Sequence, residues 1–333
     1  MLPALIHPED LRLLVEKARE RGGSVLSALL RGRTARTTAT WNRTEIVARQ
    51  WTAIPVVQER IRRRITGDPH VNVPAYIRAK YGDPEKSWRA LSLGCGTGRK
   101  ELAWFAAGGL SQLDAYDIAG KRIEEAKRLA ASAGMEHKVR FERADARYLN
   151  FPKGTYDLII FDDALHHFTP LKPLLHKIQD WLRPEGLLVV NEYVGPNRFQ
   201  WTDRQLEIAN ALREELPARM RVQPEGSKIP EIHRPGTLSM IMYDPSEAAE
   251  SSSILPELHR QFLVQEESHY GGALLHLVFK DIGHLFLQPD EEALAFLLRC
   301  IDAEDEAMQR GEIGNDFAFL VARPSTFTAV PAP

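Results

Sequence analysis

The residues with the clearest chemical pattern form a glycine-rich segment at positions 91–98, which reads Leu-Ser-Leu-Gly-Cys-Gly-Thr-Gly. Gly94, Gly96 and Gly98 follow a short apolar run and precede a helical pattern, and their lack of a Cβ lets a ligand lie against the backbone. The third glycine comes four positions after the first, and this differs from the fingerprint of dinucleotide sites. The segment therefore predicts a cofactor-binding turn of another type.

Acidic residues end the next three expected strands. Asp117 closes the second strand 19 residues after Gly98, where a carboxylate can accept hydrogen bonds from both hydroxyls of a ribose. Asp145 closes the third strand, and Asp162 and Asp163 close the fourth. Ligands of open α/β sheets bind outside the carboxyl ends of the strands, so these acids should converge there. A single such acid is more often a helix N-cap, but the ordered set favours a cofactor site.

Candidates for the chemistry on a second reactant follow the fourth and fifth strands. His166 and His167 stand just after the fourth strand, and histidine can take a proton at neutral pH. Glu192 and Tyr193 end the fifth strand, where Glu192 either orients a base, binds an amine or faces solvent. As structural alternatives, one of the histidines caps the following helix or packs beneath it, and Arg198 braces an insertion. Further candidates for substrate binding are Arg198, Tyr270 and His276.

The spacing of potential metal ligands gives no support for a metal site. The two cysteines, Cys95 and Cys300, exclude a disulfide scaffold and a cysteine-rich metal site. The sequence also has no His-x-x-x-His pair and no local cluster of histidines and carboxylates. We therefore expect no metal.

Strands and helices alternate from about residue 89 onward, and they must position these side chains. Alternation at this spacing implies a parallel sheet with helices on both faces, a doubly wound α/β domain. The expected strands cover 90–93, 113–117, 139–145, 156–162, 186–192, 262–266 and 317–323, and the expected helices cover 100–107, 123–130, 171–182, 202–216 and 289–309.

Residues 1–88 precede this pattern and predict mainly helices. Helices are expected over 8–31, 42–66 and 76–81, with an exposed connector at 33–40. Pro55 should bend or divide the second of these helices, because proline cannot donate the backbone hydrogen bond of a helix interior.

With these motifs in place, the sequence resembles class I S-adenosylmethionine-dependent methyltransferases over about residues 89–194 and 256–324. The resemblance implies a seven-stranded, mostly parallel sheet of order 3-2-1-4-5-7-6 whose seventh strand is antiparallel. It also implies S-adenosylmethionine as cofactor and S-adenosylhomocysteine as product. The residues it assigns to cofactor binding are Gly94, Cys95, Gly96, Thr97, Gly98, Asp117, Ile118, Asp145, Ala146, Asp162 and Asp163.

The segment Asp163–His167 is similar to an Asp-Ala-x-x-His element of phosphoethanolamine-type methyltransferases. That resemblance implies His167 as the catalytic base and places Asp163 near the cofactor amine. His166 and Glu192 are the further catalytic candidates.

The preferred hypothesis is methyl transfer to a small-molecule acceptor, directed to oxygen. In-line displacement would proceed under a lid formed by a helical extension, residues 1–88, and by a substrate-recognition insertion at about 196–256. The methyltransferase domain would span residues 89–324, followed by a tail at 325–333.

The alternative is a methyltransferase for RNA or protein. Residues 1–89 hold 17 Lys and Arg against 9 Asp and Glu, whereas the remainder has a net charge of −10. A basic region can bind a polyanion, but the sequence contains no recognisable RNA module, and the acidic remainder would repel nucleic acid. Nucleic acid is therefore the less favoured partner. A third hypothesis is a cofactor-binding protein without catalytic activity, which the intact glycine segment disfavours.

Composition sets the outer limits of these hypotheses. The chain has 333 residues, of which 26% are charged and 44% hydrophobic, and this excludes general disorder. We expect no membrane span and no signal peptide at the start, and hence a cytoplasmic protein. The length fits one methyltransferase domain with two additions, and the oligomeric state stays open, a homodimer included.

Overall fold

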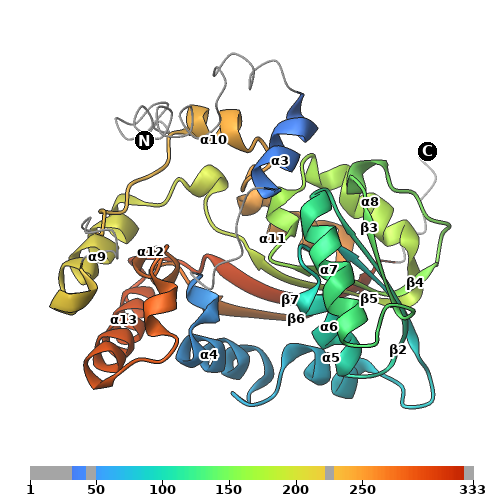
Figure 1. Cartoon of the computed structure of the whole chain (residues 1–333), viewed down its shortest axis with the longest axis horizontal. Coiled ribbons are helices and arrows are strands. Elements are labelled where there is room, and N and C mark those ends of the chain that lie inside the picture. Colours follow the sequence, from blue (N-terminus) through green and yellow to red (C-terminus); the bar gives the residue numbers. More distant parts are fainter. Residues whose placement is uncertain (1–31, 43–49, 222–228, 326–333) are drawn as a thin grey trace, which may run out of the picture.

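The computed structural model describes residues 32–42, 50–221 and 229–325, and its centre is one seven-stranded sheet (Figure 1). The strand order is β3-β2-β1-β4-β5-β7-β6, which confirms the predicted order. β7 runs antiparallel to both of its neighbours, and the other pairs are parallel. The strands are β1 Trp88–Leu93, β2 Leu110–Asp117, β3 Val139–Arg143, β4 Tyr156–Asp162, β5 Leu182–Tyr193, β6 Phe262–Gly271 and β7 Phe317–Pro324.

The central strands are buried on both faces, because alternate side chains enter two separate cores. In β4, Leu158 and Ile160 belong to one core, and Ile159 and Phe161 belong to the other. The first core also contains side chains of α4 Pro55–Thr66, α5 Val73–Tyr81, α6 Arg99–Ala106, α7 Gly120–Ser132 and α13 Glu291–Gln309. The second contains side chains of α8 Leu171–Trp181 and α11 Ile254–Gln261. This is the doubly wound arrangement that the sequence predicts.

The prediction of an exposed connector at residues 33–40 is wrong, because α3 (Arg33–Trp41) is a helix there. Thr37 is buried, and its hydroxyl donates to Asp244 Oδ1 at 3.0 Å. Arg36 Nη1 donates to the carbonyl of Ile241 at 3.3 Å, within α10 (Thr237–Tyr243). Figure 1 shows α3 and α10 side by side. These tertiary contacts outweigh the modest helix propensity of a threonine-rich segment.

The expected helix at 42–66 is also different in the structure. Residues 43–49 lie outside the described residues, and a short 3₁₀ helix at Trp51–Ala53 is followed by α4. Pro55 occupies the first turn of α4, where its missing N–H costs no hydrogen bond, so it begins the helix and does not bend it. The expected helix at 8–31 lies outside the described residues, as does the tail from residue 326.

Between β5 and β7 in the sequence, the structure has α9 Asp203–Glu214, α12 Leu275–Val278 and short 3₁₀ helices such as Asn197–Phe199. Two other 3₁₀ helices come before β5, at Ala146–Tyr148 and Leu165–His167. In the part of the chain that the structure describes, every helix falls short of the length or apolar character needed for a membrane crossing.

Candidate active site

The glycine segment forms the turn between β1 and α6, and its three glycines all have positive φ, of 76°, 54° and 75°. A Cβ on Gly98 would lie 2.5 Å from the Phe141 ring and 2.9 Å from the Ala126 Cβ. Gly98 therefore lets α6 pack closely against β3 and α7. A Cβ on Gly96 would have only the Arg122 guanidinium within 4 Å, at 3.6 Å, so Gly96 faces open space where a ligand can approach the backbone.

Two of the predicted acids hold the turns at the carboxyl ends of β2 and β3. The Asp117 carboxylate accepts hydrogen bonds from the backbone N–H groups of Gly96, at 2.9 Å, and Ala119, at 2.7 Å. Asp145 caps the helix at Ala146–Tyr148 and pairs with Arg147 Nη2 at 2.6 Å. Burial alone would raise the pKa of Asp145, but its bonds to Arg147 outweigh burial and lower it. Asp145 is thus a helix cap and Asp117 fixes two backbone turns, and both also face the cavity described below.

Glu101, in the first turn of α6, is a buried acid that the sequence analysis did not single out. The Ser92 hydroxyl donates to its Oε1 at 2.8 Å, and its Oε2 has no hydrogen-bond partner among the described residues. Burial raises the pKa of Glu101 to about 7. The side chain faces the same cavity as the glycine turn, so the carboxyl group is placed to meet a cationic part of a ligand.

Glu192 lies at the end of β5 and fixes the segment that follows β4. Its carboxylate accepts hydrogen bonds from the N–H groups of Ala164, at 2.9 Å, and Tyr193, at 2.7 Å, and also from Leu165. The Glu192 carboxylate also bonds Nδ1 of His166. With Nδ1 held by Glu192, the other ring nitrogen of His166, Nε2, points toward Glu247 at 3.5 Å.

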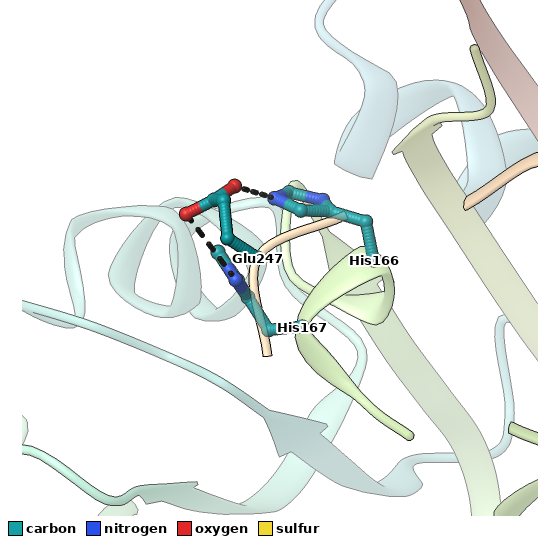
Figure 2. Close-up of side chains that lie close together, drawn as sticks. All are labelled: His166, His167 and Glu247. Atoms are coloured by element: carbon teal, nitrogen blue, oxygen red, sulfur yellow. Dashed lines mark ion pairs between the residues drawn. The ribbon is translucent and has the colours of Figure 1, made fainter. Parts of the chain in front are cut away.

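His167 and Glu247 complete this group, and Figure 2 shows the carboxylate of Glu247 between the two imidazole rings. His167 Nδ1 is 3.8 Å from Glu247 Oε2 and has no hydrogen-bond partner among the described residues. The ring of Trp41, from α3, contacts the His167 ring edge-on, with centroids 4.7 Å apart.

Burial and neighbouring charge shift the pKa values of His167, His166 and Glu247 in different directions. Burial lowers the pKa of His167, and the neighbouring His166 lowers it further. Burial would also lower the pKa of His166, but the carboxylates of Glu192 and Glu247 outweigh burial and raise it well above its ordinary value. Burial opposes ionisation of Glu247, but the two histidines lower its pKa to about 2.

Aromatic rings surround His276 beyond this group. The centroids of Tyr193, Phe199 and Phe317 lie 6.0, 5.9 and 5.5 Å from that of His276. Burial, aided by the charge of Lys280, lowers the pKa of His276 to about 4, so its ring is neutral near pH 7. The arrangement offers an apolar, aromatic surface with one neutral imidazole.

A single cavity of about 770 Å³ joins the glycine turn to the histidines and aromatic rings. Its size is within the ~300–1,000 Å³ usual for ligand sites. The predicted residues that line it are Gly94, Cys95, Gly96, Thr97, Asp117, Ile118, Asp145, Ala146, Asp162, Asp163, His166, His167, Tyr193 and His276. Lining residues that the sequence did not single out include Trp41, Glu101, Phe199, Glu247 and Phe317.

Four predicted site residues have other positions. Gly98 does not line the cavity. Glu192 does not line it either, and its carboxylate bonds His166, which does. The Arg198 guanidinium donates to the carbonyls of Pro245, at 2.8 Å, and Glu247, at 2.9 Å, which corresponds to bracing of the insertion. The Tyr270 hydroxyl donates to Asn191 Oδ1 at 2.8 Å.

Comparison with known proteins identifies a family whose model matches part of this chain. Residues 90–186 match a family described as a methyltransferase domain. The 27-O-demethylrifamycin SV methyltransferase of Amycolatopsis mediterranei is 28% identical over 106 residues, which are 32% of this chain and 39% of that protein. The demethylmenaquinone methyltransferase of Thermus thermophilus is 32% identical over 108 residues, 32% of this chain and 48% of that protein. The matched part thus spans less than half the length of these curated relatives.

Among solved structures, geranyl diphosphate methyltransferase in complex with GPP and sinefungin is similar to this chain with a TM-score of 0.46 and 13% identity, over 75% of this chain and 77% of that one. The class that the sheet order and the family match define is the S-adenosylmethionine-dependent methyltransferases of class I. Residues 90–186 of this chain are a methyltransferase domain, and the methyl donor of that class is S-adenosylmethionine, as the sequence predicts.

Proposed function

We propose that the chain methylates a small organic acceptor at an oxygen atom, inside the cavity. The observation that carries this proposal is the lining of one cavity by two chemically different ends. The glycine turn and the strand-end acids form one end, and the histidines and aromatic rings form the other. The names of the two curated relatives, which refer to a rifamycin and a menaquinone precursor, support a small molecule as the acceptor.

The residues at the first end fit S-adenosylmethionine. Gly96 leaves space against the backbone that a Cβ would fill, and Asp117 and Asp145 offer carboxylates for hydroxyl and amino groups. Glu101 and Asp163 add negative charge near the turn. When bound, S-adenosylmethionine supplies a methyl group on a positively charged sulfur, already activated for displacement.

The residues at the second end would orient the acceptor and take its proton. The aromatic surface around His276 suits an apolar or aromatic body. An attacking hydroxyl near His167 would lose its proton to Nδ1, which has no other partner among the described residues. In the same step a carbon–oxygen bond forms and the carbon–sulfur bond breaks, so the products are a methyl ether or ester and S-adenosylhomocysteine.

Two segments would exclude water from this reaction. We call them the cover, meaning α3 together with residues 237–249. The cover places Trp41 and Glu247 in the cavity wall, and the hydrogen bond from Thr37 to Asp244 joins its two segments. Exclusion of water protects an activated methyl group and strengthens the electrostatic interactions within the site.

A metabolite extract incubated with methyl-labelled S-adenosylmethionine and the full chain tests the proposal. We expect one compound to gain the mass of a methyl group, with the label on oxygen, and His167→Ala to slow the reaction by ~10²–10⁴-fold. A label found on nitrogen or carbon would contradict oxygen as the target. Full turnover by the variant would show that His167 has no part in proton removal.

A further inference from the structure

We infer that His166, His167 and Glu247 together bind a divalent transition-metal cation. Ligand-type atoms of the three side chains all lie within 4.8 Å of one another. Two of these residues are adjacent in the sequence, and the third comes from the insertion after β5, on the cover. The spacing of potential ligands in the sequence led us to expect no metal. That spacing cannot reveal this group, because Glu247 follows the histidines by 80 residues and the fold brings it next to them.

The separations suit a shared cation better than direct hydrogen bonds. Nε2 of His166 is 3.5 Å from Glu247 Oε1, and Nδ1 of His167 is 3.8 Å from Glu247 Oε2. Two ligands that are each ~2.0–2.2 Å from a tetrahedral metal lie about 3.4 Å apart. Both separations from Glu247 are therefore within a few tenths of an ångström of that value, and the ligand-type atoms of all three side chains lie within 4.8 Å of one another.

The orientation of His166 is the one that metal-binding histidines generally have. Its Nδ1 is bonded to the carboxylate of Glu192, which leaves Nε2 turned toward Glu247, at 3.5 Å. A carboxylate–histidine pair of this kind fixes the ring and makes the ligating nitrogen more basic. Glu192 is itself immobilised by the three backbone N–H groups described above, so the pair is rigid before any cation arrives.

The three side chains meet in a mostly buried place, and one of their ligand-type atoms has no hydrogen-bond partner among the described residues. The Glu247 side chain is one-fifth exposed, His166 is 7% exposed, and Nδ1 of His167 has no hydrogen-bond partner among the described residues. A proton on one imidazole can satisfy one of the two contacts with Glu247, whereas a cation satisfies both. A second set of ligand-type atoms, on Asp163, His166 and Glu192, adjoins the first and adds negative charge.

The donor set indicates the class of cation. Two imidazole nitrogens and one carboxylate favour Zn²⁺ or another first-row cation such as Fe²⁺, and such sites keep open positions for an outside ligand. All three residues line the cavity, so the open positions would face the acceptor. This last step rests on the proposed function: the cation would bind the acceptor oxygen and lower the pKa of its hydroxyl, whose proton would leave to solvent before methyl transfer. In the chain that holds the cation, His167 would be a ligand, and its role as base in the proposed function would apply to the chain without the cation.

Zinc binding by the full chain, first freed of metal with a chelator, tests the inference. Calorimetry with Zn²⁺ should give one tight site per chain, and Co²⁺ should give the visible absorption of a nitrogen-ligated, low-symmetry site. Loss of an outer partner already weakens metal sites by ~10–100-fold, so Glu247→Gln and His167→Asn should each weaken binding by at least ~100-fold. Circular dichroism and binding of S-adenosylmethionine check that each variant is folded.

A matched control comes from a second histidine–carboxylate cluster, where His259 of α11 and His269 of β6 both pair with Glu267. The double variant His259→Ala/His269→Ala removes that second histidine–carboxylate cluster and should leave the tight site intact. Loss of zinc binding in the control would assign the cation to this second cluster and overturn the inference. So would a wild-type chain with no tight site, or folded variants that bind zinc as wild type does.

The outcome for zinc is separable from the outcome for the proposed function. If zinc fails to bind while S-adenosylmethionine binds and an acceptor is methylated, only the cation inference falls. If zinc binds at these residues but no oxygen acceptor is methylated, the cation site stands and the proposed function falls.

Discussion

At the scale of single residues, Glu192 shows how one buried carboxylate can organise a reactive loop. Glu192 faces the segment that follows β4, where the N–H of Asp163 still donates to the carbonyl of Asn191 in β5, at 2.7 Å, whereas the N–H groups of Ala164 and Leu165 point to the Glu192 carboxylate. Glu192 accepts from Ala164, Leu165 and its own neighbour Tyr193, and it orients His166. A negative charge that receives several hydrogen bonds is compensated despite full burial. Glu192 is therefore a positioning residue.

Glu101 leads to a prediction about pH. Burial raises the pKa of Glu101 to about 7, and a bound cation would favour the ionised carboxylate. Binding of positively charged S-adenosylmethionine should then release a proton at lower pH and be roughly tenfold weaker near pH 6 than near pH 8. Calorimetry at both pH values measures this. In Glu101→Gln the dependence should vanish, and an equally steep dependence in that variant would show that another group titrates.

At the scale of elements, α3 packs against α10 and lines the cavity with Arg33, Thr34, Thr37 and Trp41. The contact between the two helices rests on the Thr37–Asp244 bond, the Arg36–Ile241 bond and a bond from Thr40 Oγ1 to the carbonyl of Tyr243 at 2.9 Å. Trp41 extends from the end of α3 to His167. The cover is thus in direct contact with His167, in the segment that follows β4.

Removal of one hydroxyl should loosen the cover. Thr37→Val keeps the side-chain shape and deletes the buried bond to Asp244, at a cost of ~1–3 kcal/mol because an acceptor is left with fewer donors. Trypsin should then cleave after Arg33 and Arg36 faster than in wild type, as measured by mass spectrometry. Thr38→Val is the control, since among the described residues the Thr38 hydroxyl bonds the carbonyl of Thr34, within its own helix, at 2.8 Å. Equal cleavage in both variants would mean that Thr37 does not hold the cover.

Sequence reasoning located some elements and missed others, and the difference has a physical reason. Strands such as 156–162 were predictable because a continuous apolar run must be buried on both faces. α3 was not predictable, because its polar threonines become helical only against α10. Glu247 has no local signature either, since its importance comes from two histidines 80 residues earlier in the chain. The end of the cavity at the glycine turn is built from local sequence motifs, whereas the end at the histidines is assembled by tertiary contacts.

At the scale of the whole molecule, the described residues form one sheet with helices on both faces, and α3 contacts residues 237–249 beside the cavity. Part of the positive charge of residues 50–89 is compensated inside the protein, because Arg60 and Arg64 of α4 both pair with Asp305 of α13. Arg147, further along the chain, pairs with Asp145 in the cavity wall. These ion pairs leave less positive charge for an outside polyanion.

RNA binding should accordingly be weak. We expect no retention of a structured RNA in gel shifts even at ~50 mM salt, where electrostatic binding is strong. Salt-sensitive retention that Arg62→Glu/Arg63→Glu abolishes would instead support the alternative hypothesis of an RNA methyltransferase. The double variant avoids Arg64, whose pair with Asp305 joins α4 to α13 at 2.6 Å.

Calorimetric titration of the full chain with S-adenosylmethionine tests most directly whether this cavity is a methyl-donor site. Gly96→Asp would place a second carboxylate where the backbone N–H of residue 96 now donates to Asp117, in the space open to a ligand. We predict one binding site per chain for the wild type and no measurable binding for the folded variant. A wild-type chain that does not bind S-adenosylmethionine, or a variant that binds it with unchanged affinity, would contradict the assignment.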